Sequence, residues 1–140
     1  MNSNRTFSAA ELYENWKTAK SSITELREVQ LVAYQSIVKA GYEKGCLEGQ
    51  KKLYEQERER ARKMLERQDL ALSTEEVFLE REGMLSEKIS DAEEAIATCQ
   101  SSVSQLELVV NKTDEQIDRL LDRIDELLQL RAEDVCNSNN

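Results

Sequence analysis

Histidine and proline are absent from this sequence of 140 residues. Without histidine the chain lacks the commonest general base and the commonest metal ligand, which excludes Ser/His/Asp and Cys/His catalysis. Without proline no helix interior loses an N–H group, so helices of any length are permitted. Carboxylates on paired helices form solvated faces and no enclosed pocket. We therefore expect no enzyme activity, no metal, no cofactor and no small-molecule substrate.

Aromatic residues are also scarce, at 5%, and only 39% of the chain is hydrophobic while 34% is charged. This composition is typical of a long helix or a coiled coil and provides too little for a thick globular core. There is no run of about 18 apolar residues and no apolar N-terminal segment, so we expect neither a membrane span nor a secretion signal. Three cysteines (Cys46, Cys99 and Cys136) match no metal or redox spacing. Together these features predict a reducing, cytoplasmic location.

The formal net charge of −9 is unevenly distributed. Residues 1–72 hold 13 Lys/Arg and 11 Asp/Glu, whereas residues 73–140 hold 6 and 17. An acidic protein is a poor candidate for binding nucleic acid or anionic membranes. One alternative function follows from the same charge, namely that the carboxylates of residues 75–94 make the chain an acidic inhibitor that occupies a nucleic-acid-binding site.

The strongest pattern present is an unbroken heptad over residues 85–127. Its a positions are all β-branched: Ile89, Ile96, Val103, Val110, Ile117 and Ile124. Its d positions are Leu85, Ala92, Cys99, Leu106, Thr113, Leu120 and Leu127. A 3.5-residue repeat of this length makes a helix supercoil around a partner helix. The heptad therefore predicts that protein–protein contact is the main activity of the chain.

A second helical pattern precedes the heptad. Its apolar positions alternate three and four apart with a gap at Gln30, and are Leu12, Trp16, Ala19, Ile23, Leu26, Ala33, Ile37 and Ala40. Ser8 and Glu11 predict a capping box at its start, with Phe7 and Leu12 as a hydrophobic staple. The strongly charged segment 50–67 is expected to continue this helix through propensity and intrahelical ion pairs.

A fold-back is expected near residue 71. Ser73 and Glu76 repeat the capping-box spacing, with Leu72 and Val77 as a second staple. We predict a flexible tail at 1–7, a first helix at 8–70, a turn at 71–75, a second helix at 74–133 and a disordered tail at 134–140. The alternative is one continuous helix. Charge favours the fold-back, because it brings the basic segment 51–67 opposite the acidic segment 76–95.

The predicted fold is all-α: an elongated antiparallel helical hairpin or coiled coil that oligomerises into a multi-helix coiled coil. The small or polar d residues, together with apolar Val109, Leu121 and Leu128 beside the heptad, favour three or four helices. The expected partner is a second copy of the chain, another helical coiled-coil protein, or both. The predicted interface residues are Ile89, Ala92, Ile96, Cys99, Val103, Leu106, Val110, Ile117, Leu120, Ile124 and Leu127, with Trp16, Ile23, Leu26 and Ile37 as the opposing stripe.

Gly41, Gly45 and Gly49 form a ladder in the segment AGYEKGCLEG. Glycines four apart share one helical face and allow a second backbone to approach closely, so the ladder predicts either a close helix contact or a hinge. Over residues 40–49 it is similar to the ladder in the ATPase-regulator (stator) proteins of flagellar and type III secretion export. The hairpin layout also resembles the export stalk subunits in architecture. The main expectation is a non-enzymatic structural subunit or adaptor, and this resemblance implies the alternative of a chaperone or regulator of an export apparatus.

Overall fold

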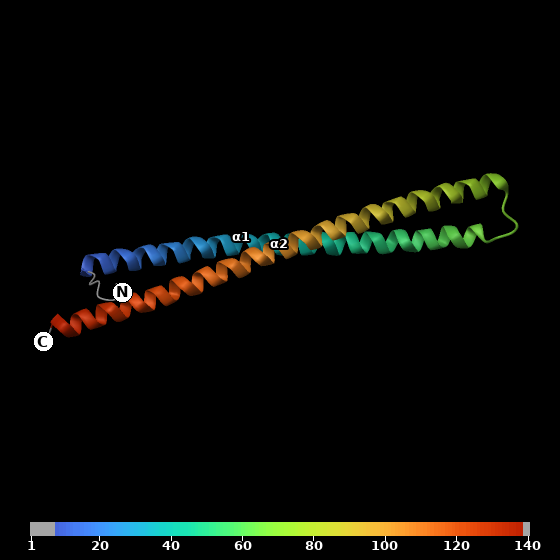
Figure 1. Ribbon diagram of the computed structural model, residues 1–140. Coiled ribbons are helices and arrows are strands. Elements are labelled where there is room, and N and C mark those ends of the chain that lie inside the picture. Colours follow the sequence, from blue (N-terminus) through green and yellow to red (C-terminus); the bar gives the residue numbers. More distant parts are fainter. Residues whose placement is uncertain (1–7, 139–140) are drawn as a thin grey trace, which may run out of the picture. The chain divides into compact units, whose positions relative to one another are not determined.

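The computed structural model describes residues 8–138, with side chains described for residues 8–133. It contains two α-helices packed against each other as a hairpin, α1 (Ala9–Leu65) and α2 (Leu72–Ser138), and no strand within the described range (Figure 1). The prediction of an all-α hairpin is confirmed, and the alternative of one continuous helix is wrong. Oligomerisation stays a prediction.

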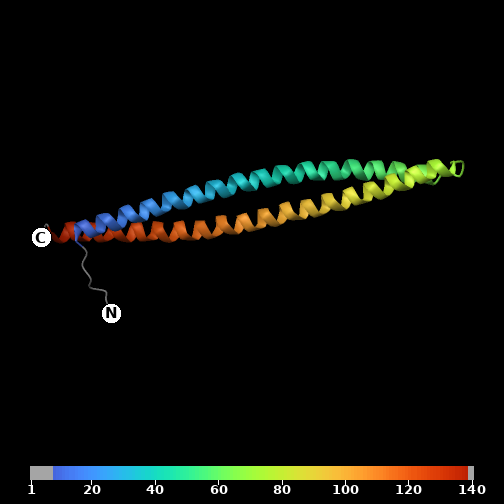
Figure 2. The same ribbon diagram turned by 90° about the horizontal axis from the view of Figure 1, so that it is seen from above.

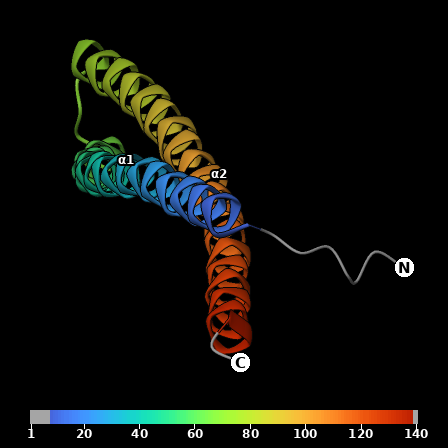
Figure 3. The same cartoon turned by 90° about the vertical axis from the view of Figure 1, so that its left-hand side faces the viewer.

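The hairpin divides into two compact units. The terminal unit pairs the start of α1, up to Gln35, with α2 from Glu107 onward, and the loop unit comprises Ser36–Leu106. In the terminal unit Gln30 contacts Asp114, and the beginning of α1 lies beside the late part of α2 (Figures 2 and 3). In the loop unit Lys51 contacts Glu93 and Arg62 contacts Glu82. Within each unit the helices are therefore antiparallel.

The first helix begins as its capping residue predicts. The Ser8 hydroxyl accepts a hydrogen bond from the Glu11 backbone N–H at 3.2 Å. The Ser8 carbonyl accepts the first intrahelical bond, from the Leu12 N–H at 3.0 Å. This is the geometry of an N-cap, in which a side-chain oxygen satisfies an N–H that has no partner inside the helix. Phe7, the other half of the predicted staple, lies outside the described residues.

The turn lies earlier than predicted. The expected first helix to residue 70 ends at Leu65, where the Arg67 N–H bonds three residues back to the Met64 carbonyl and tightens the last turn. The Arg67 guanidinium then binds both carboxylate oxygens of Asp69 at 3.2 and 3.0 Å. The carbonyl of Ala71 accepts the Glu75 N–H at 2.9 Å, so Ala71 directly precedes the first residue of α2, Leu72. The predicted turn at 71–75 is wrong.

The prediction of a capping box at Ser73 is also wrong, because Ser73 already lies in the first turn of α2. A second boundary differs at the other end of this helix. α2 continues to Ser138, so the predictions of a helix end at 133 and of disorder are wrong for residues 134–138. No proline or glycine stands in this segment to stop the helix. Residues 139–140 of the predicted tail lie outside the described residues.

The heptad of α2 is buried along its whole length. Every a and d position from Leu85 to Leu127 is buried or half-buried, while the positions between them are mostly exposed. α1 carries a matching heptad from Leu12 to Leu65 with no interruption, and each of its a and d positions is likewise buried or half-buried. We call these two sets of a and d residues the seam. Gln30 and Lys51 belong to it, although sequence reasoning left both outside the apolar pattern.

Candidate protein interface

The predicted interface residues lie in the seam between the two helices of this chain. In the terminal unit they are Trp16, Ile23 and Leu26 on α1, and Val110, Ile117, Leu120, Ile124 and Leu127 on α2. In the loop unit they are Ile37 on α1, and Ile89, Ala92, Ile96, Cys99, Val103 and Leu106 on α2. All are buried or half-buried against the opposite helix. The hairpin itself covers these residues. Their use by a second protein stays a prediction.

Two polar seam residues of the terminal unit have hydrogen-bond partners. Gln30, at an a position, donates from Nε2 to the Asp114 carboxylate at 2.5 Å and to the Val110 carbonyl at 3.4 Å. Thr113, at a d position, donates its hydroxyl to the carbonyls of Val110 at 2.8 Å and Val109 at 3.0 Å. A polar residue at an a position restricts the register of the two helices at some cost in stability, and hydrogen bonds such as these limit that cost. Gln30 therefore aligns α1 with α2 in this unit.

In the loop unit, charged side chains cross the seam. Lys51 Nζ lies 3.3 Å from a Glu93 carboxylate oxygen, Arg62 Nε lies 2.9 Å from Glu82, and Arg81 lies 4.0 Å from Glu57. These pairs confirm the predicted opposition of the 51–67 and 76–95 segments. All of them are partly exposed, so each contributes about 0.2–1 kcal/mol and mainly selects register.

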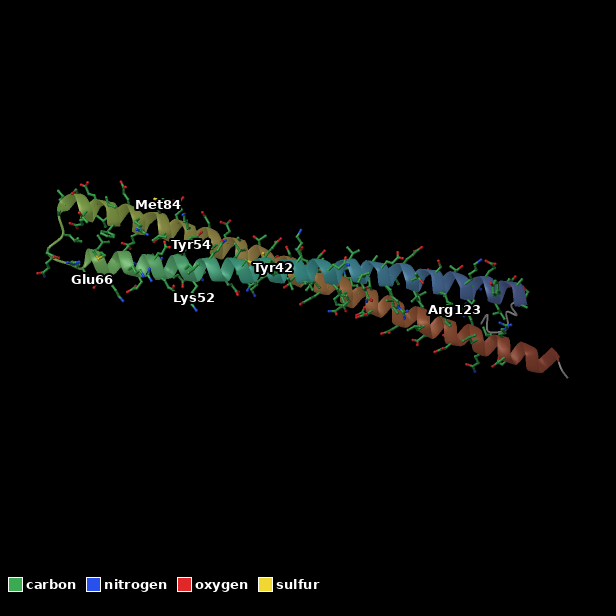
Figure 4. All side chains as sticks on the ribbon, turned by 180° about the vertical axis from the view of Figure 1, so that it is seen from behind. Tyr42, Lys52, Tyr54, Glu66, Met84 and Arg123 are labelled. Carbon is green, nitrogen blue, oxygen red and sulfur yellow. The ribbon has the colours of Figure 1, made fainter. Side chains whose placement is uncertain are left out.

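Aromatic packing supplements these ion pairs. Tyr54 lies between the two helices, where Lys88 Nζ stands 5.5 Å from its ring centroid, while Lys52 and Met84 point away from the opposite helix (Figure 4). Arg58, an a residue, reaches across to the Ser86 hydroxyl at 3.5 Å. Long side chains of this kind cover the seam with their carbon stems and keep their charges near water. The acidic face at 75–94 is accordingly partly neutralised by α1.

A groove of about 250 Å³ opens at the end of the terminal unit. Its lining is mainly apolar and carries one cation, and consists of Ala9, Leu12, Tyr13, Trp16, Leu127, Leu128 and Arg131. The Tyr13 and Trp16 rings stand 5.9 Å apart, and Lys20 Nζ lies 4.6 Å from the Trp16 ring centroid. The groove provides apolar and cation–π surface and no general base, so it is suited to packing against another surface and not to chemistry.

Large apolar residues also remain exposed on the outer faces of both helices. On α1 they include Val29, Leu31, Val32, Tyr34, Val38 and Tyr42, and on α2 Leu79, Met84, Leu108, Val109, Leu121 and Leu128. Sequence reasoning found Val109, Leu121 and Leu128 because the α2 heptad defines their positions. It did not single out Leu79, Met84 and Leu108 on α2. It missed the residues on α1, because the apolar gap at Gln30 left that helix without a continuous heptad frame.

The glycine ladder lies on the outer side of α1, in the loop unit. Gly41, Gly45 and Gly49 are all exposed, and the helix runs through them without a break. A Cβ atom built on any of the three would have no atom of the chain within 4 Å, apart from its own helix backbone. The ladder thus makes no close contact within the described residues, and its contact with another protein stays a prediction.

Replacing the three ladder glycines by alanine measures how much they reduce the stability of α1. We expect Gly41→Ala, Gly45→Ala and Gly49→Ala combined to raise the free energy of unfolding by about 2 kcal/mol, because each helical glycine costs about 0.5–1 kcal/mol relative to alanine. Chemical denaturation monitored by circular dichroism measures this. Gly83→Ala on α2 is the matched control, since Gly83 is equally open and helical. A triple variant that is less stable than the original chain would contradict the open environment of the ladder.

Carboxylates are abundant on both helices but do not converge on a metal site. Among the described residues no group of three Cys, Asp or Glu side chains is placed to hold an ion. Neither of the two described helices includes a segment long and apolar enough to cross a membrane. Comparison with protein-family models, with curated proteins and with solved structures gives no match to this chain.

Proposed function

We propose that this chain is a non-enzymatic structural subunit or adaptor in a larger protein assembly. The observation that carries the proposal is that the hairpin satisfies its own seam and still leaves large apolar side chains exposed outside it. Tyr13 in the terminal unit is 53% exposed, and Val38 and Tyr42 in the loop unit are 72% and 75% exposed. Large apolar residues outside the seam that two helices share are typical of helices that pack against further helices.

A second candidate is a chaperone or regulator that binds its client reversibly. The same exposed side chains support it, because a chaperone presents apolar surface in its free state. Val38 and Tyr42 lie one helical turn apart, so they form one continuous apolar strip on α1. The two candidates differ in the lifetime and stoichiometry of the complex. A subunit is bound in a fixed ratio, whereas a regulator dissociates.

Purification of the tagged full-length chain from its source cell, followed by native mass spectrometry, tests the proposal. For a structural subunit we expect the chain in a complex of fixed stoichiometry that survives gel filtration. A partner lost on dilution favours the regulator. A chain recovered as a monomer with no partner at any concentration would contradict both candidates.

Two variants locate the surface. Tyr13→Glu with Leu128→Glu places charges on the exposed apolar lining of the groove, and we expect it to remove any partner bound there. Thr18→Glu with Gln129→Glu is the matched control, because it adds the same charge at two exposed polar positions of the same unit. Circular dichroism of each variant shows whether the hairpin is retained, so that loss of binding and loss of fold are distinguished.

A further inference from the structure

We propose that one face of the terminal unit binds the same face of a second copy of this chain, forming a four-helix bundle. We call it the e face, after the heptad position of its members. They are Tyr13, Lys20, Arg27 and Tyr34 on α1, and Glu107, Asp114, Leu121 and Leu128 on α2. This inference rests on the proposed function and names the partner that the assembly surface takes.

The members of the e face lie on one side of the unit. On each helix they are spaced seven residues apart, immediately after a d position, so they follow the seam along one flank. Two contacts connect the rows on the two helices. Tyr13 and Leu128 line the same groove, and Asp114 is bonded to Gln30, which stands one turn from Arg27. The two rows are therefore at matching levels, with Tyr13 beside Leu128 and Arg27 beside Asp114.

The e face is mainly apolar at the end with Tyr13, Leu121 and Leu128, and it carries Arg27, Asp114 and Glu107 together with the half-exposed Tyr34 along the rest. Tyr13, Leu121 and Leu128 are 53%, 40% and 49% exposed, and Trp16 is half-buried in the groove between them. These side chains lose their apolar contact with water if a second surface covers them, which is the main favourable contribution to association. A partner for this end must therefore also be apolar at the level of residues 13 and 128.

The charges select a second copy and its orientation. Every ionisable group of the α1 row other than tyrosine is basic (Lys20 and Arg27), and the polar residues of the α2 row are acidic (Glu107 and Asp114). A two-fold axis parallel to the helices places α1 of one copy over α2 of the other at the same level. It brings Tyr13 onto Leu128 and Arg27 onto Asp114 of the second copy, while Lys20 covers Leu121 with its carbon stem and Tyr34 meets Glu107. Such self-complementarity is what an isologous interface requires.

The other face-to-face arrangement is disfavoured by the same charges. A two-fold axis perpendicular to the helices places α1 over α1, which brings Lys20 of one copy near Arg27 of the other. Like charges at these positions repel. Within the described residues Arg27 has no ion-pair partner at 4.0 Å or less, so it is available for a contact between copies.

Charge reversal tests the arrangement by analytical ultracentrifugation. The dimer has two equivalent contacts between position 27 of one copy and position 114 of the other. Arg27→Asp alone or Asp114→Arg alone places like charges at both of them. We expect either variant to raise the dissociation constant of the dimer about tenfold or more. Mixing the two variants in equal amounts restores both contacts, because the aspartate introduced at position 27 of one chain then meets the arginine introduced at position 114 of the other. We expect the mixed dimer to match the original to within about threefold. In the mixture, positions 27 and 114 of any one chain still carry charges of the same sign. Restored affinity must therefore come from the contact between the two copies.

A control and a direct geometric test accompany this experiment. Lys17→Asp and Asp118→Arg reverse charges at exposed positions off the e face and are expected to leave dimerisation unchanged. In a background of Cys46→Ser, Cys99→Ala and Cys136→Ser, a mixture of Tyr13→Cys and Leu128→Cys chains should form an intermolecular disulfide on oxidation. Each of these two variants alone should form much less, because like positions are diagonal to each other in the bundle.

The outcomes separate this inference from the proposed function. An original chain that stays monomeric at about 100 μM, or an unrestored mixture, overturns the e-face dimer, since a dimer with a dissociation constant of about 10 μM would be mostly associated at that concentration. A fixed complex with a different protein, isolated from cells in that case, leaves the proposed function intact. Dimers that tolerate both single reversals place the interface elsewhere and also overturn the e face.

Discussion

We expect Val103→Glu combined with Val110→Glu to abolish the hairpin at about 25 °C. Val110 is 6% exposed and Val103 is half-buried, and both are a residues of the seam. A carboxylate buried there without a partner costs several kcal/mol. Two of them approach the whole stability of a small domain, which is about 5–15 kcal/mol. Loss of the helical circular dichroism signal and of a cooperative melt would show this result.

The matched control keeps the added charge and changes only its position. Ser104→Glu with Leu108→Glu introduces the same two carboxylates on the same stretch of α2, at exposed positions. We expect its free energy of unfolding to change by about 0.5 kcal/mol or less. If both double variants were equally folded, the a positions of α2 would not face α1 in solution.

An association assay with the seam variant would measure unfolding of the hairpin together with any loss of a partner. From the heptad alone, the seam variant is expected to abolish contact with another protein. Because the seam is occupied by α1 of the same chain, the variant loses its fold first, and any loss of association follows from unfolding. Partner binding is therefore tested with outer positions, such as Tyr13 and Arg27, which leave the seam intact.

Leu85→Ala should lower the free energy of unfolding by about 2–4 kcal/mol, the second-largest effect. Leu85 is 5% exposed at a d position of the loop unit, so its truncation removes buried apolar surface and leaves a cavity. On α1, Arg58 and Tyr54 lie at the levels of Ser86 and Lys88, close to Leu85, and these side chains cannot refill such a cavity with close-packed methyl groups. Urea denaturation gives the difference directly.

Leu79→Ala provides the control for this substitution. The change is chemically identical and lies on the same helix, but Leu79 is 53% exposed. We expect a loss of about 0.5 kcal/mol, because surface substitutions away from special features have small effects. Equal losses at positions 79 and 85 would contradict the heptad frame of α2 in the loop unit.

The sequence alone determined the fold class and the α2 half of the seam. Absence of proline permitted long helices, and the unbroken β-branched a series from Ile89 to Ile124 defined which face of α2 is buried. This succeeds because heptad periodicity is a local property, set by how often the backbone returns to one side of its own axis. Ser8 was also identified correctly, since an N-cap depends only on residues within one turn.

Boundaries near residue 71 were predicted less well, for a physical reason. Ser73 and Glu76 have capping-box spacing, but α2 already begins at Leu72, and the carbonyl of the preceding residue, Ala71, accepts its first backbone hydrogen bond. α1 ends at Leu65 and α2 begins at Leu72, so the chain reverses over residues 66–71, where Arg67 binds Asp69. Where a helix ends depends on how the two helices meet across the turn as well as on nearby capping residues, so a capping pattern alone does not fix the boundary.

Only the tertiary structure decided what lies opposite the α2 heptad. Heptad periodicity shows that a helix has a partner without identifying it, because any helix with a suitable face buries the same side chains. On α1 the matching frame is hidden, since Gln30, Lys44, Lys51 and Arg58 occupy a positions that an apolar pattern cannot recognise. The seam contacts of three of them, with Asp114, Glu93 and Ser86, exist only once the chain has folded back.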